Sequence, residues 1–472
     1  MAELIDYDLK FTSDGRPLHT GGYKLRRFFN WFPMGLTYAF LYMGRYNLTV
    51  ATNALGDMIT GSDFGVIFGA GTFVYAFAFL INGPLTDRIG GKWAILIAAL
   101  GAGTMNLIMG IMVYLVLAKN LTINIVLVFS ILYMLNMYFQ SFGAVSIVKV
   151  NSSWFHVRER GVFGGIFGVL ISLGIYFAFD WSESIVSATM SVASVGEISW
   201  IQKILRSLLG ATDATIDQTW WVFLIPGILL YTFCVIEFFL LKDSPKQAGL
   251  YRLDTADASS GEEDKPLPLK ELLVRILTNK VIITVAAIEL CTGVIRQGIM
   301  HWYHIFNHDV IHLARDHFMV AHWGLILMLA GSTGGMLAGI LSDKVFGSRR
   351  GPVAALLYGL MIAATAFMLF IIYKNPIYLA VVVTIISFCV IGTHGMLSGT
   401  ATMDFGGRRG AATAVGLIDG AVYLGTGLQS VSIGFLTKIN WTLWPVFIVP
   451  FSILGFVLAV KIWHAMPQPK KK

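Results

Sequence analysis

The stretch that is most informative about the fold runs from Gly35 to Val50 and reads GLTYAFLYMGRYNLTV. It lies inside a long apolar run that a single guanidinium, that of Arg45, interrupts. An arginine near the middle of a bilayer costs about 3 kcal/mol on insertion scales, so it normally faces a protein interior or a water-filled cavity. At helical spacing one stripe of this stretch carries Tyr38, Tyr42, Arg45 and Thr49. The pattern predicts a membrane-spanning helix whose polar stripe faces inward.

A second arginine of this kind, Arg296, lies within a later apolar run at 281–306. Two buried arginines, with no obvious carboxylate beside the first, predict a site for an anion that the protein binds. Each planar guanidinium offers a fork of donors, and each charge-assisted bond to a phosphate oxygen contributes about 1.5–3 kcal/mol. The alternative for Arg45 and for Arg296 is structural pairing with a carboxylate from another helix.

The composition places the chain among polytopic membrane proteins. It has 472 residues, of which 56% are hydrophobic and 13% are charged, and its mean hydropathy is +0.71. A soluble protein carries about 25% charged residues. The net charge of +7 gathers in alternate short loops, as the positive-inside rule expects, so we predict no nucleic-acid partner. The three cysteines lie far apart in apolar runs and indicate neither a disulfide framework nor a metal motif.

Twelve apolar runs are each long enough for one membrane-spanning helix. We place them at about 29–54, 64–85, 93–117, 123–147, 161–180, 219–241, 279–306, 317–342, 353–373, 377–402, 412–437 and 443–463. The predicted fold is an all-α membrane protein with two pseudo-symmetric six-helix bundles. Basic residues gather near both chain ends and in the loops that follow the second, fourth, eighth and tenth spans. This distribution predicts that both termini are cytoplasmic.

The expected organisation is an N-terminal bundle at 1–241, a cytoplasmic linker at 242–278 and a C-terminal bundle at 279–472. The middle of the linker, 254–264, is acidic and lacks apolar periodicity, so we predict that it is flexible. On the opposite side, 181–218 is too polar to span. Within it, 198–209 has the pattern of a short amphipathic helix, either a lid or, as we favour, a plain surface loop.

The two halves repeat each other. The second span is followed by Gly83-Pro-Leu-Thr-Asp87-Arg88-Ile-Gly-Gly-Lys92, and the eighth by Gly339-Ile-Leu-Ser-Asp343-Lys344. Arg45 and Arg296 each lie in the first span of their half. Parallel repeats of this kind place a substrate site at their interface, near the middle of the membrane.

The loop pattern resembles the major facilitator superfamily, whose signature after the second span is matched by Gly83, Asp87, Arg88, Gly90 and Lys92. Within it the chain is similar to the organophosphate:phosphate antiporter family. Besides the two arginines, the resemblance rests on WFHVRERG at 154–161 and DSPKQAGL at 243–250. It implies exchange of an organic phosphate ester for inorganic phosphate by alternating access, in a monomer of the bacterial inner membrane.

The same resemblance implies a cytoplasmic gate, at which Asp87, Arg88 and Arg160 pair near the helix ends, with Asp343 as the counterpart in the second half. A simple topology signal is the alternative. The chain departs from the glycerol-3-phosphate type at Tyr46, Phe79, Ile171 and Gly293, where that type has a lysine, a lysine, a histidine and a tyrosine. Tyr38, Tyr42, Tyr75 and Tyr423 are retained, either to line the substrate or to pack between helices.

Glu289 is the most informative departure. Seven residues separate it from Arg296, which is about 10.5 Å along a helix, so the two share a cavity without pairing, and we expect Gly293 between them to leave room for ligand or water. Glu289 either accepts a proton, binds a cationic substrate group, or partners another buried polar side chain. Asp419 in the eleventh span is a second candidate partner, and His394 in the tenth either bonds substrate or packs.

Six histidines, His301, His304, His308, His312, His317 and His322, gather at the outer end of the seventh and eighth spans. We interpret them as interfacial rather than as metal ligands, and we expect no cofactor. No Walker pattern or catalytic constellation is present, so neither ATP-driven transport nor an enzyme is expected. The leading hypothesis is phosphate-ester exchange. Its competitors are proton symport of an anion through Glu289 or Asp419, and a membrane sensor of sugar phosphate.

Overall fold

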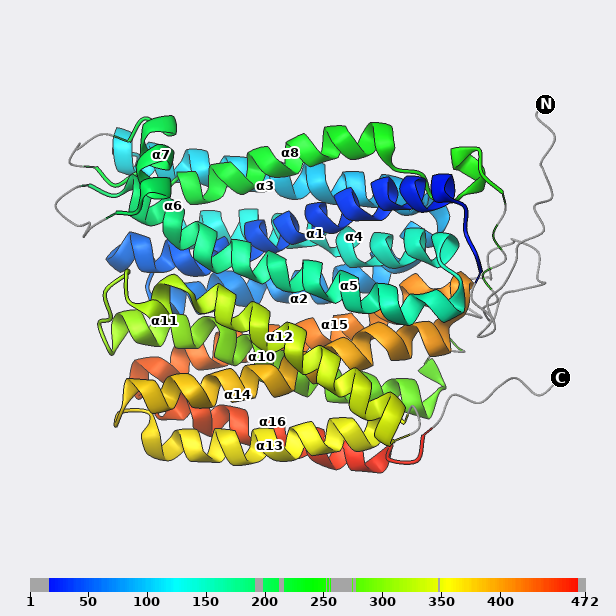
Figure 1. The fold of residues 1–472 in the computed structure, drawn as a ribbon. Coiled ribbons are helices and arrows are strands. Elements are labelled where there is room, and N and C mark those ends of the chain that lie inside the picture. The colour runs from blue at the N-terminus through cyan, green and yellow to red at the C-terminus, as the bar shows by residue number, and fades with distance from the viewer. Residues whose placement is uncertain are drawn as a thin grey trace.

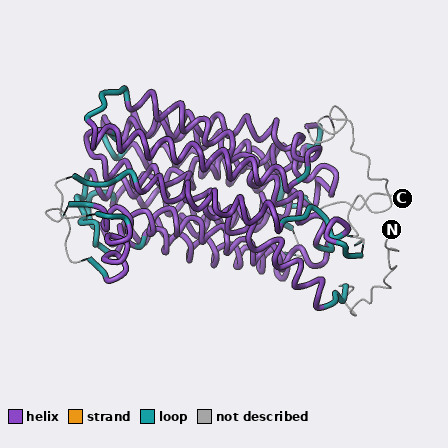
Figure 2. The backbone as a smooth tube through the Cα atoms, turned by 90° about the horizontal axis from the view of Figure 1, so that it is seen from above, coloured by secondary structure: helices purple, strands orange, loops and turns teal. Residues whose placement is uncertain are grey.

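The computed structural model describes residues 17–191, 198–211, 216–251, 253, 255, 274, 277–346 and 349–465. At 157, 158, 160–167, 343 and 399–412 it describes the backbone without the side chains. Over the described residues, helices make up the body of the molecule and loops join them at its two ends (Figure 2).

The N-terminal half supplies six long helical units. They are α1 (Gly21–Leu55), α2 (Gly61–Ile89), α3 (Gly91–Lys119), α4 (Ile125–Trp154), α5 (Val157–Tyr176) and α8 (Trp221–Leu240). A π-helical turn, η2 (Phe177–Trp181), continues α5 into α6 (Ser182–Thr189), and the short α7 (Trp200–Leu208) lies between α6 and α8.

The C-terminal half supplies six more. They are α10 (Lys280–Asp309), α12 (Trp323–Ile340), α13 (Arg350–Ile371), α14 (Pro376–His394), α15 (Thr402–Ile439) and α16 (Leu443–Lys461). A short helix, α11 (Phe318–Ala321), precedes α12, and π-helical turns extend α12 (η5, Leu341–Val345) and α14 (η6, Gly395–Ala401). The predicted all-α fold with two six-helix bundles is confirmed, and the bundles lie one above the other in Figure 1.

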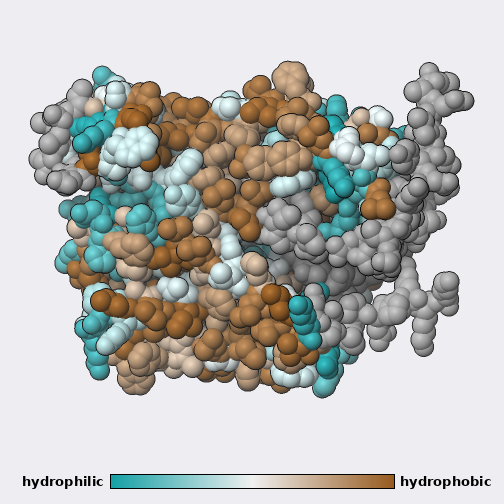
Figure 3. Space-filling model, in the orientation of Figure 1, coloured by the Kyte–Doolittle hydropathy of each residue, from teal (hydrophilic) through white to brown (hydrophobic). Residues whose placement is uncertain are grey.

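Ten helical segments of the described chain have the length and apolarity of a membrane span, and α1 and α15 complete the twelve. Large apolar side chains such as Phe77, Ile81, Phe367 and Phe370 are exposed on the outer faces of these helices. In Figure 3 apolar residues cover the middle of the visible face, and hydrophilic ones gather towards its two ends. The molecule is therefore a multi-pass membrane protein.

The loop that follows α2 owes its shape to one glycine. Gly90 has a φ of 91°, a conformation that side chains other than glycine rarely adopt. A Cβ at this position would lie 2.6 Å from an Asp243 carboxylate oxygen. Asp243 in turn accepts a hydrogen bond from the backbone N–H of Lys92 at 2.7 Å. The GxxxDRxGxK motif thus joins the start of α3 to the segment after α8.

The two halves pack through α2 against α15, through α5 against α12, and through α1 against α10. Glycines permit the closest approach of α2 and α15: a Cβ on Gly65 would lie 2.7 Å from the Ser430 carbonyl oxygen, and one on Gly416 would lie 2.6 Å from that of Phe79. Such small-residue contacts replace the hydrophobic effect as the packing device inside a bilayer. The start of α1 and the end of α16 lie at one end of the molecule, which we call the terminal end (Figure 1). The opposite end, with α6, α7 and α11, is the distal end.

One expectation about the connections needs correction. The fifth span does not end near residue 180, because η2 and α6 carry the helical path on to Thr189. The polarity of the stretch from residue 181 onward argued against a continued helix, but the carboxylates of Asp180 and Glu183 are buried and hydrogen-bonded, to backbone amides and to Arg315 respectively. Within 198–209 a helix does form, as α7, and its apolar face is exposed. Most of the acidic stretch 254–264 lies outside the described residues.

Candidate functional site

Arg45 is fully buried, at 0% exposure, and every nitrogen of its guanidinium has a partner. Nε donates to Gln140 Oε1 at 2.8 Å, Nη2 donates to the Tyr75 hydroxyl at 2.7 Å, and Nη1 donates to the Tyr423 hydroxyl. The rings of Tyr42 and Tyr75 lie 4.7 and 4.6 Å from the guanidinium carbon, close enough for cation–π attraction. These partners are amide and phenol groups, so among the described side chains the positive charge is bonded to no carboxylate.

Hydrogen bonds to its backbone carbonyl oxygens hold the helix turn that carries Arg45. The carbonyl oxygen of Gly44 accepts hydrogen bonds from Asn106 and Asn136, each at 3.0 Å. The Tyr133 hydroxyl donates to the carbonyl oxygen of Arg45 at 2.9 Å. Gln140, which holds Nε, donates to Asn136 at 3.1 Å. Sequence reasoning missed this network, although asparagine and glutamine inside apolar runs were a readable signal.

Arg296, from α10 of the other half, is 6% exposed, and its surroundings are different. Its Nε and Nη2 are buried and have no hydrogen-bond partner. A buried donor without a partner costs about 1–3 kcal/mol, and more when it is charged. Its neighbour Gln297 donates to the Tyr46 hydroxyl at 2.7 Å, which ties α10 to α1 beside Arg45. Two buried arginines, one from each half, thus face the same region.

Glu289 lies two turns before Arg296 and is 0% exposed. Its Oε2 is 2.7 Å from Nδ1 of His394, whereas its Oε1 is buried without a partner. Asp419 on α15, which is 9% exposed, accepts a hydrogen bond from Ser398. The structure therefore brings Glu289 and His394 into direct contact, the pairing that sequence reasoning offered as the alternative to a ligand role.

Gly293 does not open space between Glu289 and Arg296, as we had expected. A Cβ there would lie 1.9 Å from the carbonyl oxygen of Val422, so the glycine admits the backbone of α15. Tyr38 and Tyr42 are both buried and pack edge to face, with ring centroids 5.2 Å apart. Tyr75 and Tyr423 also contact edge to face, with ring centroids 4.3 Å apart. Tyr42, Tyr75 and Tyr423 lie around the Arg45 guanidinium, whereas Tyr38 packs against Tyr42.

At the terminal end, Asp87 pairs with a residue that the sequence did not single out. Its carboxylate accepts a hydrogen bond from Lys149 at 2.8 Å and one from Thr413, on α15 of the other half, at 3.4 Å. Arg88, the next residue, is exposed. The side chains of Arg160 and Asp343 lie outside the described part of the chain, so the gate assigned to these four residues stays a prediction.

The start of the predicted linker also docks at the terminal end. The Tyr251 hydroxyl lies 2.6 Å from His19 Nδ1, and His19 Nε2 lies 3.1 Å from Glu159. Arg27 bonds the same carboxylate at 3.1 Å. Burial alone would raise the pKa of Glu159, but the His19 hydrogen bond and the Arg27 charge outweigh it and lower that pKa to about 2.

At the distal end the halves are bonded to each other. Arg315, which follows α10, donates to Glu183 at 2.7 Å and to the carbonyl oxygen of Asn53 at 2.9 Å. The backbone N–H of Gly324 donates to Asp180 at 2.7 Å. Thr49 lies 2.7 Å from Nδ1 of His301. These contacts cross between the halves and close this end of the site.

The six histidines do not share one role. His301 and His304 are buried between the halves, which differs from the interfacial position that we expected, because α10 turns both toward the N-terminal bundle. The other four lie at or beyond the end of α10. Among the described residues no group of three potential metal ligands occurs.

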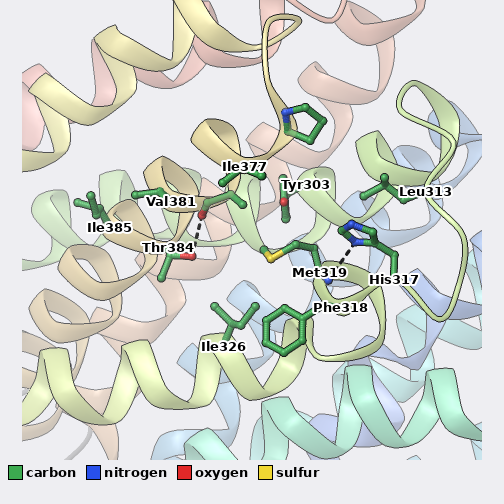
Figure 4. Close-up of a pocket in the computed structure, with 12 residues that line it drawn as sticks. Tyr303, Leu313, His317, Phe318, Met319, Ile326, Ile377, Val381, Thr384 and Ile385 are labelled. Atoms are coloured by element: carbon green, nitrogen blue, oxygen red, sulfur yellow. Dashed lines mark hydrogen bonds between the residues drawn. The ribbon is translucent and has the colours of Figure 1, made fainter.

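A cavity of about 540 Å³ lies apart from the two arginines. It is lined mainly by apolar side chains of α11, α14 and the end of α10, among them Tyr303, Phe318, Ile377 and Val381 (Figure 4). It contains none of the predicted substrate-binding residues. The cavity therefore differs from the surroundings of Arg45 and Arg296 both in its position and in its mainly apolar lining.

Comparisons with known proteins agree with this architecture. The sequence model of the Major Facilitator Superfamily matches residues 34–430. The chain is 23% identical over 453 residues to the glycerol-3-phosphate transporter of Bacillus subtilis, with 90% of each chain covered. It is 23% identical to a probable hexose phosphate transport protein of Chlamydia pneumoniae, over 94% of this chain and 92% of that one. It is 21% identical to the membrane sensor protein UhpC of Salmonella typhimurium, over 86% and 85%.

A similar solved structure is that of a bacterial homologue of the human lysosomal transporter Spinster, in an inward-facing and unoccupied conformation. It is 13% identical, with a TM-score of 0.70, and the match covers 94% of this chain and 98% of that one. At this identity the likeness concerns the fold.

Proposed function

Because the chain belongs to the Major Facilitator Superfamily, a family of transporters and not of enzymes, we propose that it exchanges an organic phosphate ester for inorganic phosphate by alternating access. The observation that carries the proposal is the pair of buried arginines, one from each half. Arg45 bonds only uncharged groups, and Arg296 keeps two buried donors without partners. Phosphate offers several charged acceptor oxygens, which can satisfy the open donors of Arg296 and give Arg45 charge-assisted bonds in place of bonds to neutral groups.

Alternating access follows from the origin of the two arginines. A phosphate that reaches both of them is held by both bundles, so the loaded carrier gains bonds when the halves close around it. The same closure without an anion leaves two buried donors of Arg296 without acceptors, which is unfavourable. Obligatory exchange is the expected result, because the loaded carrier changes state far more readily than the carrier without ligand.

The relatives support an ester substrate as a class and no particular ester. Two of those named above are described as transporters of glycerol-3-phosphate and of hexose phosphate. Tyr46, where the glycerol-3-phosphate type has a lysine, is fully buried and accepts a hydrogen bond from Gln297. It adds no cation to the site, so the non-phosphate part of the substrate meets different groups here. Bacterial relatives also support a location in the inner membrane.

The proposal is tested by exchange in proteoliposomes loaded with inorganic phosphate, using labelled phosphate outside and then a panel of esters. Arg45→Lys and Arg296→Lys are each expected to abolish exchange while the protein still folds, because an ammonium keeps the charge and loses the planar fork. Lys24→Arg is the matched control, since Lys24 lies on α1 but is exposed. Near-normal exchange by either lysine variant would remove the two-arginine model.

A sensor is the second candidate, because one relative is described as a membrane sensor protein. The same reconstitution separates the two. Purified protein that binds phosphate through Arg45, yet moves none across the liposome membrane against any ester, would favour the sensor. Exchange at rates well above leakage would favour the transporter.

A further inference from the structure

The buried charges around the two arginines cancel before any ligand binds. The described site contains two guanidiniums, those of Arg45 and Arg296, and two carboxylates, those of Glu289 and Asp419. All four side chains are at most 9% exposed. With His394 uncharged, the formal charges of the four groups sum to zero. Both carboxylates belong to the C-terminal half, Glu289 to α10 and Asp419 to α15.

A dianionic phosphate upsets this balance. Its arrival would leave two uncompensated negative charges in a buried region, and burying net charge is among the most unfavourable events in a protein interior. Positive charge must therefore enter with the phosphate. Two sources have the right chemistry: protons from solution, or a cationic group on the substrate itself.

We infer, resting on the function proposed above, that phosphate binding is coupled to proton uptake, and that the Glu289–His394 pair holds one of the protons. Glu289 has the geometry for this role. Its Oε2 is engaged by His394 at 2.7 Å, whereas Oε1 is buried and has no partner. A protonated carboxyl group donates from one oxygen while the other still accepts. A proton on Oε1 turns this atom from an acceptor into a donor for a ligand oxygen.

The other groups near Glu289 are less suited. Asp419 already accepts a hydrogen bond from Ser398. On α13, the Tyr358 hydroxyl bonds Thr292 at 2.8 Å and the Ile288 carbonyl oxygen at 3.0 Å. Cys291 on α10 is a buried thiol, and Arg296 remains cationic. The other titratable groups of the site are the phenols of Tyr42, Tyr46, Tyr75 and Tyr423, whose rings lie around the Arg45 guanidinium.

The proton balance of the step is simple. Solution gives one proton to Glu289 Oε1 as the dianion binds, which compensates one of the two added negative charges, and the same proton leaves when the phosphate is released at the other face. No covalent bond other than this O–H bond forms or breaks. In phosphate–ester exchange, protons thus travel in both directions with their anions, and net proton movement depends on the two anions carried.

The test measures proton uptake by purified protein when inorganic phosphate is added at about pH 8, where phosphate is almost wholly the dianion. Wild type is expected to take up about one proton more per bound phosphate than Glu289→Gln does. Glu237→Gln is the matched control: Glu237 is equally buried, on α8, but bonds Thr37 outside the site. This variant should behave as wild type. Between about pH 6 and 8, phosphate affinity should rise as pH falls, more steeply in wild type than in Glu289→Gln.

Each outcome of these measurements either supports or overturns the inference. Phosphate binding that depends on Arg45 but shows the same proton uptake in wild type and Glu289→Gln overturns this inference and leaves the proposed function intact. Failure of wild type to bind phosphate through Arg45 overturns both. If Glu289→Gln does not fold, wild type alone decides, because absence of net proton uptake at about pH 8 contradicts the charge argument.

The cationic-substrate alternative has its own readout. A preference for 2-aminoethyl phosphate over ethyl phosphate that Glu289→Gln abolishes, without any change in proton uptake, would assign Glu289 to an ammonium group and overturn the proton role. His394→Gln is expected to reduce the Glu289-dependent proton uptake while phosphate binding persists. A purely structural histidine would leave the pH slope unchanged.

Discussion

Arg45 and Arg296 occupy the first helix of their respective halves, yet one is fully bonded and the other is not. The groups around the Arg45 guanidinium are Gln140 and the tyrosines Tyr42, Tyr46, Tyr75 and Tyr423. Hydrogen bonds from Tyr133, Asn106 and Asn136 fix its helix turn. Arg296 has two buried nitrogens without a partner, and two turns away Glu289 has an oxygen without one. Corresponding positions of a repeat have therefore diverged in how far their polar groups are satisfied.

This difference indicates that the two halves contribute to the proposed site in different ways. The N-terminal half holds its cation in one geometry, so little reorganisation is needed when an anion arrives. The C-terminal half retains unsatisfied donors and acceptors, and these gain most from a ligand. We therefore expect affinity to depend on both arginines, and fold stability to depend on Arg45 far more than on Arg296.

The largest expected difference in stability between the two arginines appears when each is replaced by methionine. Arg45→Met should lower the stability of the protein by about 3 kcal/mol or more, because Gln140, Tyr75 and Tyr423 lose a charged partner. Arg296→Met should leave stability unchanged or raise it by about 1 kcal/mol, since it removes buried donors that have no partner. The measurement is the unfolding temperature in detergent without phosphate. Equal destabilisation by the two substitutions would contradict the division.

A second substitution tests how tightly the C-terminal site is packed. Gly293→Ala should destabilise by about 1–3 kcal/mol, because its Cβ would meet the Val422 carbonyl oxygen and force α10 and α15 apart. Gly335→Ala is the control, as a Cβ there meets nothing within 4 Å, and alanine favours a helix by about 1 kcal/mol over glycine. If Gly293→Ala is as stable as wild type, the site is more open than the structure indicates.

The gate residues provide a smaller effect, away from both arginines. Asp87→Asn should slow exchange about tenfold with little change in equilibrium affinity, because it alters the balance of conformations and not the ligand contacts. Lys149→Gln should act in the same direction, since it removes the other member of the pair. Exchange rates and phosphate binding are measured side by side, with the exposed Asp309→Asn as control. An affinity loss as large as that of Arg45→Ala would mean that Asp87 belongs to the site.

The smallest effect concerns pH. The pKa of Glu159, about 2, lies below the ordinary value of about 4.3 for glutamate. Its contribution to stability is therefore fully present above about pH 4.3 and is lost as pH falls toward the folded-state pKa. The destabilisation caused by Glu159→Gln should therefore shrink as pH falls from about 5 to about 3, because the wild-type carboxylate then loses its charge. An unfolding-temperature difference as large at about pH 3 as at about pH 5 would mean that the partners of Glu159 do not hold it ionised.

Much of the fold was predictable because it depends on local properties of the chain. Apolar runs of sufficient length must form helices in a bilayer, and the repeated loop motif indicated two related halves. The two arginines were also predictable, since a charge within an apolar run is costly wherever it lies. The correction after residue 180 has a physical reason: polar residues argue against a continued helix only when they lack partners, and the partner of Glu183, Arg315, lies more than 130 residues away.

The pairings inside the site were not predictable in the same way. That Gln140 holds Arg45, that Lys149 holds Asp87 and that His394 meets Glu289 depends on the rotation of each helix about its axis. Sequence periodicity fixes which residues share a face but not which face meets which neighbour. The role of Gly293 was misjudged for the same reason, because the close approach of Val422 is a property of helix packing.

In the alternating-access cycle that we propose, the bond between Asp180 and Gly324 has a consequence. The residue that precedes α12, His322, makes no side-chain cap, and the amide groups of Gly324 and Leu325 are satisfied by a carboxylate from the opposite half. The first turn of α12 thus depends on an N-cap borrowed from another bundle, which also complements the positive end of its helix dipole. When the distal end opens, α12 must give up this cap to water. Helix capping is in this way part of the free-energy difference between the closed and the open states of the carrier.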